Sequence, residues 1–233
     1  MRIFLLSEGV TDMGRVDSEG SFRTESTLPH LIRKLLHEVV ADAQIDFSTK
    51  RGPRLFPRKE RMGRSQRGFA NRLSGVLGLK EGREADAIVM VVDRDGKKNK
   101  DRIGELNKGR EEVLKAKKPC AVGVAIEEIE AWLLADEKAL RIALDDSTIP
   151  RQPDPESLDS RDESSDKNPK GRLERIMTIA FGKEIRRHAF PDLYAAIAAT
   201  AEIQLLEVRC PGGFQPFATQ IRELASACED SIE

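Results

Sequence analysis

Long hydrophobic runs are missing from this chain. Of its 233 residues, 39% are hydrophobic and 34% are charged, and no apolar stretch approaches the roughly 18 residues that span a bilayer. The apolar run at the N-terminus covers residues 3–6, which is shorter than the core of about 7 to 15 residues in a secretory signal. We therefore expect a soluble, cytoplasmic protein without membrane contact.

Cysteine is also scarce. Cys120, Cys210 and Cys228 are odd in number and far apart, with no C-x-x-C pair and no histidine at zinc spacing. This pattern indicates neither a disulfide framework nor a structural zinc site. We expect all three to be reduced thiols.

A strong net charge is missing as well, because 39 Lys and Arg residues face 40 Asp and Glu residues, for a net charge of -1. The charge is nevertheless segregated. Residues 50–72 hold nine basic residues and one acid, Glu60, a net +8 that leaves -9 for the rest of the chain. Such a stretch suits a polyanionic partner, although a run of charge is also common on an ordinary solvated surface.

Short apolar runs and helical stripes alternate along the first part of the chain. Strands are predicted at 2–6, 43–48, 87–92 and 120–126, and helices at 28–40, 69–76, 102–117 and 127–144. The run at 87–92, AIVMVV, is apolar on both faces and belongs in the middle of a sheet. The alternation predicts an α/β fold with a mostly parallel sheet flanked by helices.

The chain is long for one domain and short for two, so we expect one core with an elaboration. The predicted core covers residues 1–149, with a polar loop from Asp12 to Thr24 and the basic loop at 50–72. Residues 150–170, rich in Pro, Asp and Ser, predict a surface excursion or mobile loop. Residues 171–233 predict a C-terminal helical extension packed on the core, with helices near 173–180, 193–206 and 217–228.

Acidic residues follow three of the predicted strands. They are Glu8 after the first, Asp93 and Asp95 after the third, and Glu127, Glu128 and Glu130 after the fourth. Ligands of open α/β sheets bind at this carboxyl edge, and a neighbouring strand about 4.8 Å away would bring Glu8 beside Asp93 and Asp95. Clustered carboxylates repel one another, and a hard cation such as Mg²⁺ or Mn²⁺ relieves that repulsion. Taken singly, each site also has an ordinary explanation, as a turn or as favourable charge at a helix start.

Several short motifs resemble known families. Glu8-Gly9-Val10-Thr11-Asp12 and Val91-Val92-Asp93-Arg94-Asp95-Gly96 resemble the E-G and D-x-D motifs of the Toprim fold, which topoisomerases, primases and OLD nucleases share. Residues 128–136 (EIEAWLLAD), 168–170 (NPK) and 210–214 (CPGGF) resemble the Toprim-like DUF4276 family along nearly the whole chain. This resemblance implies a relationship to the RloB proteins and OLD-type nucleases, and a place in prokaryotic anti-phage defence beside an ATPase.

The resemblance also implies roles for individual residues. It makes Glu8 a metal ligand or general base, and Asp93 and Asp95 ligands of Mg²⁺. The implied catalytic residues are Glu8, Asp93, Asp95 and Glu128. The implied metal ligands are Glu8, Asp12, Asp93, Asp95, Glu128 and Glu130. The single tyrosine, Tyr194, falls in the helical tail, which counts against topoisomerase chemistry.

We therefore expect a Mg²⁺-dependent (or Mn²⁺-dependent) Toprim-like nuclease that cleaves phosphodiester bonds of DNA or RNA. The cations expected to contact the phosphate backbone are Arg51, Arg54, Arg58, Lys59, Arg61, Arg64, Arg67 and Lys97. One alternative is a non-catalytic Toprim-like sensor or a scaffold for an ATPase partner. Another is a small-molecule phosphohydrolase, which is disfavoured because the phosphatases with a D-x-D-G motif carry it after the first strand, where this chain has Glu8.

Overall fold

The computed structural model describes residues 1–7, 9–17, 20–49, 68–94, 101–158, 160, 162–182 and 185–229. Within these ranges, no helix combines the length and the apolar character needed to cross a membrane. The three cysteines are all buried and unpaired, as expected.

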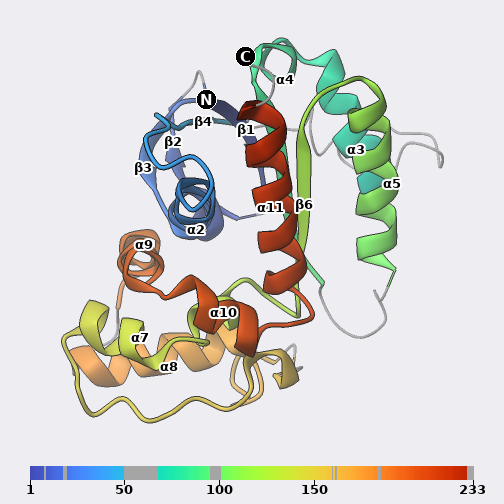
Figure 1. The fold of residues 1–233 in the computed structure, drawn as a ribbon. Helices are drawn as coiled ribbons and strands as arrows, with labels where there is room; N and C mark the ends of the chain where they lie inside the picture. The colour runs from blue at the N-terminus through green and yellow to red at the C-terminus, as the bar shows by residue number, and fades with distance from the viewer. Residues whose placement is uncertain are drawn as a thin grey trace.

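Four apolar segments form one parallel sheet in the order β4-β1-β5-β6 (Figure 1). They are β1 (Arg2–Leu6), β4 (Asp46–Ser48), β5 (Ala87–Asp93) and β6 (Cys120–Ala125). Strand β5 lies inside the sheet, as predicted, and every residue from Ala87 to Val92 is buried. The register pairs Leu6 with Met90 and Asp93 with Ala125, so the carboxyl ends of β1, β5 and β6 lie side by side.

Helices cover both faces of this sheet, because alternate strand residues point to opposite sides. On one face, Ile3 and Leu5 join a large core with α2 (Thr27–His37) and α11 (Phe214–Glu229). On the other face, Phe4 and Leu6 join a smaller core with α3 (Phe69–Gly75) and α5 (Arg102–Lys115). The predicted α/β class, with a parallel sheet between helices, is confirmed.

A second group of helices gathers where β6 ends (Figure 1). It consists of α6 (Glu130–Leu133), α7 (Glu137–Leu144), α8 (Pro169–Phe181), α9 (Phe190–Thr200) and α10 (Ile203–Arg209). Trp132 of α6 is fully buried and lies against Phe214 and Phe217 of α11, with ring centroids 5.1 and 5.6 Å apart. The helical C-terminal part therefore shares one continuous core with the sheet.

Local breaks divide two of the predicted helices. The helix expected at 127–144 is interrupted by Asp136, whose carboxylate accepts from the Ala139 amide (3.0 Å) and so starts α7. The same carboxylate accepts from the Glu202 amide at 2.9 Å, next to the break between α9 and α10. The prediction of a single helix over 193–206 was therefore also wrong.

The segment after β1 holds more structure than expected. The described residues of this segment form α1 (Val10–Met13) and an antiparallel pair of strands, β2 (Gly14–Val16) and β3 (Phe22–Glu25), in place of the predicted polar loop. The strand expected at 43–48 is shorter, because only Asp46–Ser48 pairs with β1. In the described part of the chain the remaining short elements are α4 (Lys80–Glu84) and the 3-10 turns η2 (Val76–Gly78), η4 (Pro155–Ser157) and η5 (Arg187–Ala189).

The polar segment after α7 is fastened to the body at several points. The Arg209 guanidinium donates to the carbonyls of Gln152 and Pro153, each at 2.8 Å. The Glu156 carboxylate accepts from the amides of Gly212 and Gly213, each at 2.7 Å. The CPGGF turn therefore ties this segment to the start of α11.

We expect Phe217→Ala to lower the free energy of unfolding by about 3–5 kcal/mol, because it removes a buried ring that stacks on Trp132. Urea denaturation followed by fluorescence of the single tryptophan measures the change. The control is Val208→Ala on α10, where the side chain is 76% exposed and a change within about 0.5 kcal/mol is expected. Equal effects of the two variants would contradict a shared core.

Candidate acidic site at the carboxyl edge of the sheet

Acidic residues follow three neighbouring strands at one edge of the sheet. Asp12 lies on α1, directly after β1, and Asp93 is the last residue of β5. Glu128 and Glu130 follow β6. The sequence predicted these acids at one edge of the sheet. In the structure β1, β5 and β6 are neighbouring strands, so the residues that follow them lie at the same edge.

Other predicted site residues lie outside the described residues. Among the predicted metal ligands these are Glu8 and Asp95. The predicted phosphate contacts that also lie outside the described residues are Arg51, Arg54, Arg58, Lys59, Arg61, Arg64, Arg67 and Lys97. In the part of the chain that is described, no three acidic, histidine or cysteine side chains form a group that could hold a metal ion. A complete ligand set would therefore need Glu8 or Asp95.

Asp12 is held inside the turn that follows β1. Its side chain is buried, and its Oδ2 accepts from the Ser7 hydroxyl at 2.6 Å and from the Gly9 amide at 3.0 Å. A Cβ atom on residue 9 would come within 3.0 Å of that oxygen, so Gly9 allows the close approach. The glycine of the E-G motif thus helps to position the Asp12 carboxylate.

Asp93 connects β5 to the turn that follows β6. Its Oδ1 accepts from the amide of Ile129 at 3.0 Å, and its carbonyl accepts from the Arg102 guanidinium. The carboxylate therefore fixes the backbone between Glu128 and Glu130. The end of β5 thus orients Glu128 and Glu130, which follow β6.

Glu127 has a structural position in the same turn. Its φ of 63° lies in the left-handed region, which is unfavourable for a residue with a side chain. Its side chain is 3% exposed and forms an ion pair with Arg94. This ion pair stabilises the turn. We therefore assign Glu127 a structural role and keep Glu128 and Glu130 as the candidate site residues.

Glu128 is held by the NPK motif, a relationship that the sequence alone did not reveal. Its Oε2 accepts from the Lys170 amide at 3.2 Å and from the Asn168 side chain at 3.5 Å. Asn168 also caps α8, since its Oδ1 accepts from the Gly171 amide at 2.6 Å. In the sequence, the Asn-Pro pair is typical of a helix start. It does not indicate a contact with Glu128, which is 40 residues away.

Glu130 lies in surroundings that disfavour its charged form. It is 5% exposed, and burial raises its pKa to about 8, with further increases from the neighbouring charges of Asp12 and Glu128. Lys170 offsets part of this effect. Asp12, Glu128 and Glu130 therefore form an electrostatically coupled group, which we call the acidic site.

Two cationic side chains gather around Phe69 near the end of β5. The guanidinium of Arg102 contacts the end of β5 and also lies over the ring of Phe69, 5.2 Å from its centroid. Arg72, the last basic residue of the +8 stretch, lies over the same ring at 5.0 Å. Phe69 thus anchors two cations near the edge where the acids meet.

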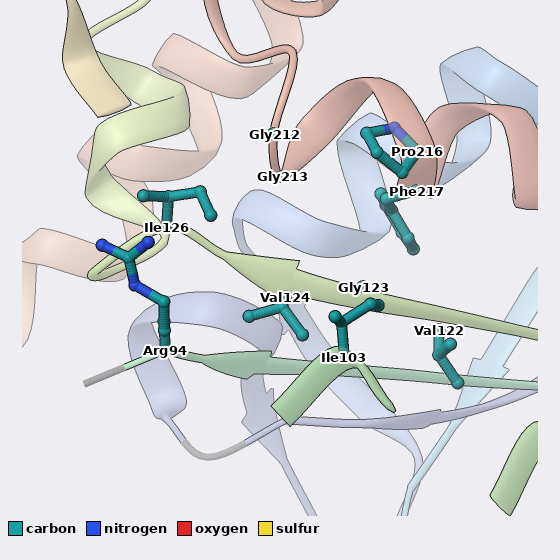
Figure 2. Close-up of a pocket in the computed structure, with 10 residues that line it drawn as sticks. All are labelled: Arg94, Ile103, Val122, Gly123, Val124, Ile126, Gly212, Gly213, Pro216 and Phe217. Carbon is teal, nitrogen blue, oxygen red and sulfur yellow. The ribbon is translucent and has the colours of Figure 1, made fainter. Parts of the chain in front are cut away.

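A cavity of about 220 Å³ opens along the free edge of β6. Figure 2 shows Arg94 and Ile126 at one end and Phe217 of α11 over the strand. The volume lies below the roughly 300 Å³ at which small-molecule pockets begin, and no predicted metal ligand lines it. We assign this cavity no part in the acidic site.

Comparison with known proteins identifies a family. A family model described as a domain of unknown function, DUF4276, matches residues 22–222. No curated protein and no solved structure matches the chain.

We expect Glu130→Gln to change how stability depends on pH in the presence of EDTA. The folded pKa of about 8 lies above the ordinary 4.5, so this group favours folding at pH values below 4.5, and its contribution is lost as the pH rises towards 8. The stability of the variant relative to the native protein should therefore rise across that window by a few kcal/mol, as an order of magnitude. Urea denaturation at a series of pH values measures it.

The matched control for this prediction is Glu111→Gln, because Glu111 is exposed on α5. Its stability relative to the native protein should stay constant across the same pH range. A flat profile for Glu130→Gln would show that Glu130 is not buried among like charges.

Proposed function

The chain belongs to the DUF4276 family, and from this premise we propose that it is a divalent-metal-dependent nuclease that cleaves phosphodiester bonds of nucleic acid. The observation that carries the proposal is the acidic site, in which Glu130 is buried beside the charges of Asp12 and Glu128 at the carboxyl edge of a parallel sheet. That edge is where ligands of open α/β sheets bind. Buried like charges are costly to the fold unless a ligand of opposite charge compensates them.

The donor atoms fit a hard cation. All the candidate ligands are carboxylates, namely Asp12, Asp93, Glu128 and Glu130 together with the predicted Glu8 and Asp95, and oxygen ligands suit Mg²⁺ and Mn²⁺ better than zinc. A cation bound there would polarise a phosphodiester and lower the pKa of a bound water.

The protein's own groups supply orientation around this site. The carboxylate of Asp93 fixes the turn that carries Glu128 and Glu130, and Asn168 with the Lys170 amide holds Glu128. Glu8 or Glu128 is the proposed base that positions the attacking water. The fixed supports favour a preorganised arrangement of the acids.

The basic stretch supports nucleic acid as the substrate. Residues 50–72 carry +8 in a chain whose remainder carries -9. Its last member, Arg72, lies with Arg102 over Phe69, and Arg102 contacts the end of β5. The position of these cations near the end of β5 supports the proposal that they contact a phosphate backbone.

The proposed setting rests on the resemblance of the motifs. It is a cytoplasmic, Toprim-like member of a prokaryotic anti-phage defence system, working beside an ATPase partner. The buried, unpaired cysteines are compatible with a reducing compartment. A sensor or scaffold that keeps the acids without catalysis is the leading alternative.

We expect Asp93→Asn to lower nuclease activity in Mg²⁺ or Mn²⁺ by roughly 100-fold or more, because the substitution removes a charged candidate ligand. The amide oxygen can still accept from the Ile129 amide, so the turn should persist. Cleavage of single-stranded and double-stranded DNA and RNA measures the effect, and EDTA should abolish the native activity.

The matched control is Asp86→Asn, at the opposite end of β5, where the carboxylate accepts from the Arg2 amide at 2.7 Å. This variant should keep native activity. Cleavage that survives EDTA and Asp93→Asn would exclude the metal mechanism. Absence of cleavage on every substrate would favour the sensor or scaffold, and release of phosphate from small phosphomonoesters would favour the phosphohydrolase.

We expect replacement of Arg54, Arg58 and Arg61 by Ala to weaken nucleic-acid binding and to flatten its salt dependence. Each lost phosphate contact should reduce the slope of log K against log salt by about 0.9 for duplex DNA. Fluorescence anisotropy over a range of salt concentrations measures the slope. The control replaces the exposed Lys80, Lys108 and Lys115, and equal slopes for both triple variants would exclude the basic stretch from the phosphate path.

A further inference from the structure

Tyr194 reaches the acidic site from the C-terminal helices. It lies on α9, which packs against both α1, the helix of Asp12, and α6, the helix of Glu130. The side chain is fully buried, and its ring stacks on Phe190 with centroids 6.1 Å apart and planes 12° apart. The position of the phenol is therefore set by packing.

The hydroxyl of Tyr194 has acidic neighbours on several elements. Burial raises its pKa well above the ordinary value, and the charges of Glu130, Glu174 and Asp12 raise it further. These acids come from α6, α8 and α1. A phenol is protonated at neutral pH in any case, so the hydroxyl is available as a donor.

This donor makes no hydrogen bond of ordinary geometry to the described residues, although it is buried and Glu130 adjoins it. Buried polar atoms without a partner are rare, and each one calls for an explanation. The Tyr194 hydroxyl is therefore a buried donor among acidic side chains that is free to form a further hydrogen bond.

We propose that Tyr194 is a positioning residue of the acidic site: when a divalent cation binds, the Tyr194 hydroxyl donates to the Glu130 carboxylate and orients it towards that cation. The inference rests on the proposed function, because it assumes that Glu130 is a metal ligand. Ligating carboxylates are commonly held by such outer hydrogen bonds, and losing one costs about 10- to 100-fold in metal affinity or activity. Because the hydroxyl is buried, it cannot attack a phosphodiester, so a covalent role is excluded.

The chain has one tyrosine, so protein labelled with ¹³C at the tyrosine Cζ gives a single NMR resonance for this group. We expect that resonance to shift on titration with Mg²⁺ and to saturate at the concentration at which the cation binds by calorimetry. Tyr194→Phe should weaken Mn²⁺ binding, measured by electron paramagnetic resonance, by about 10-fold. The control Phe190→Leu alters the packing of the same ring but keeps the hydroxyl, and it should bind Mn²⁺ with native affinity.

The outcomes separate this inference from the proposed function. Native affinity in Tyr194→Phe, together with an unmoved resonance in a protein that does bind Mg²⁺, would overturn the role of Tyr194 and leave the metal site in place. Equal losses in Tyr194→Phe and Phe190→Leu would reduce Tyr194 to a packing residue. Failure of the native protein to bind either cation would overturn both proposals.

Discussion

The turn between β6 and α6 is the constraint on which the candidate site depends. Glu127 takes a left-handed conformation, with a φ of 63°, and its ion pair with Arg94 holds it there. Removing Arg94 would leave the buried Glu127 charge without compensation, which is strongly unfavourable. The Asp93 carboxylate fixes the same turn through the Ile129 amide. Two consecutive residues at the end of β5 thus decide where the chain goes after β6.

The side chains that follow this turn lie in two different environments. Glu128 and Glu130 join Asp12 in the acidic site, while Trp132 enters the aromatic cluster with Phe214 and Phe217. Trp132 shares the large core with residues of α7, α8 and α10, the helices that Figure 1 shows gathered where β6 ends. The core of the C-terminal part and the burial of Glu130 therefore have one structural origin.

Two motifs that look like local turns connect distant parts of this arrangement. Asn168 caps its own helix and also contacts Glu128, and Gly212 and Gly213 hold the Glu156 carboxylate. A Cβ atom on residue 213 would come within 2.8 Å of the Val124 carbonyl, so the turn lies close against β6. The helix starts were predictable from composition. Their contacts were not, because sequence spacing carries no information about partners 40 or more residues away.

The sequence by itself determined the class of fold and the edge at which the acids gather. The apolar run of β5 required cover on both faces, and parallel strands necessarily bring their carboxyl ends together. Tertiary structure decided which acids share one environment, and it brought Tyr194 to Glu130 from a helix that the sequence assigned to the tail. It also divided the predicted helices at Asp136 and Ala201, since one carboxylate serves both breaks. Burial and charge coupling arise from packing between elements, and the periodicity of a single element does not encode that packing.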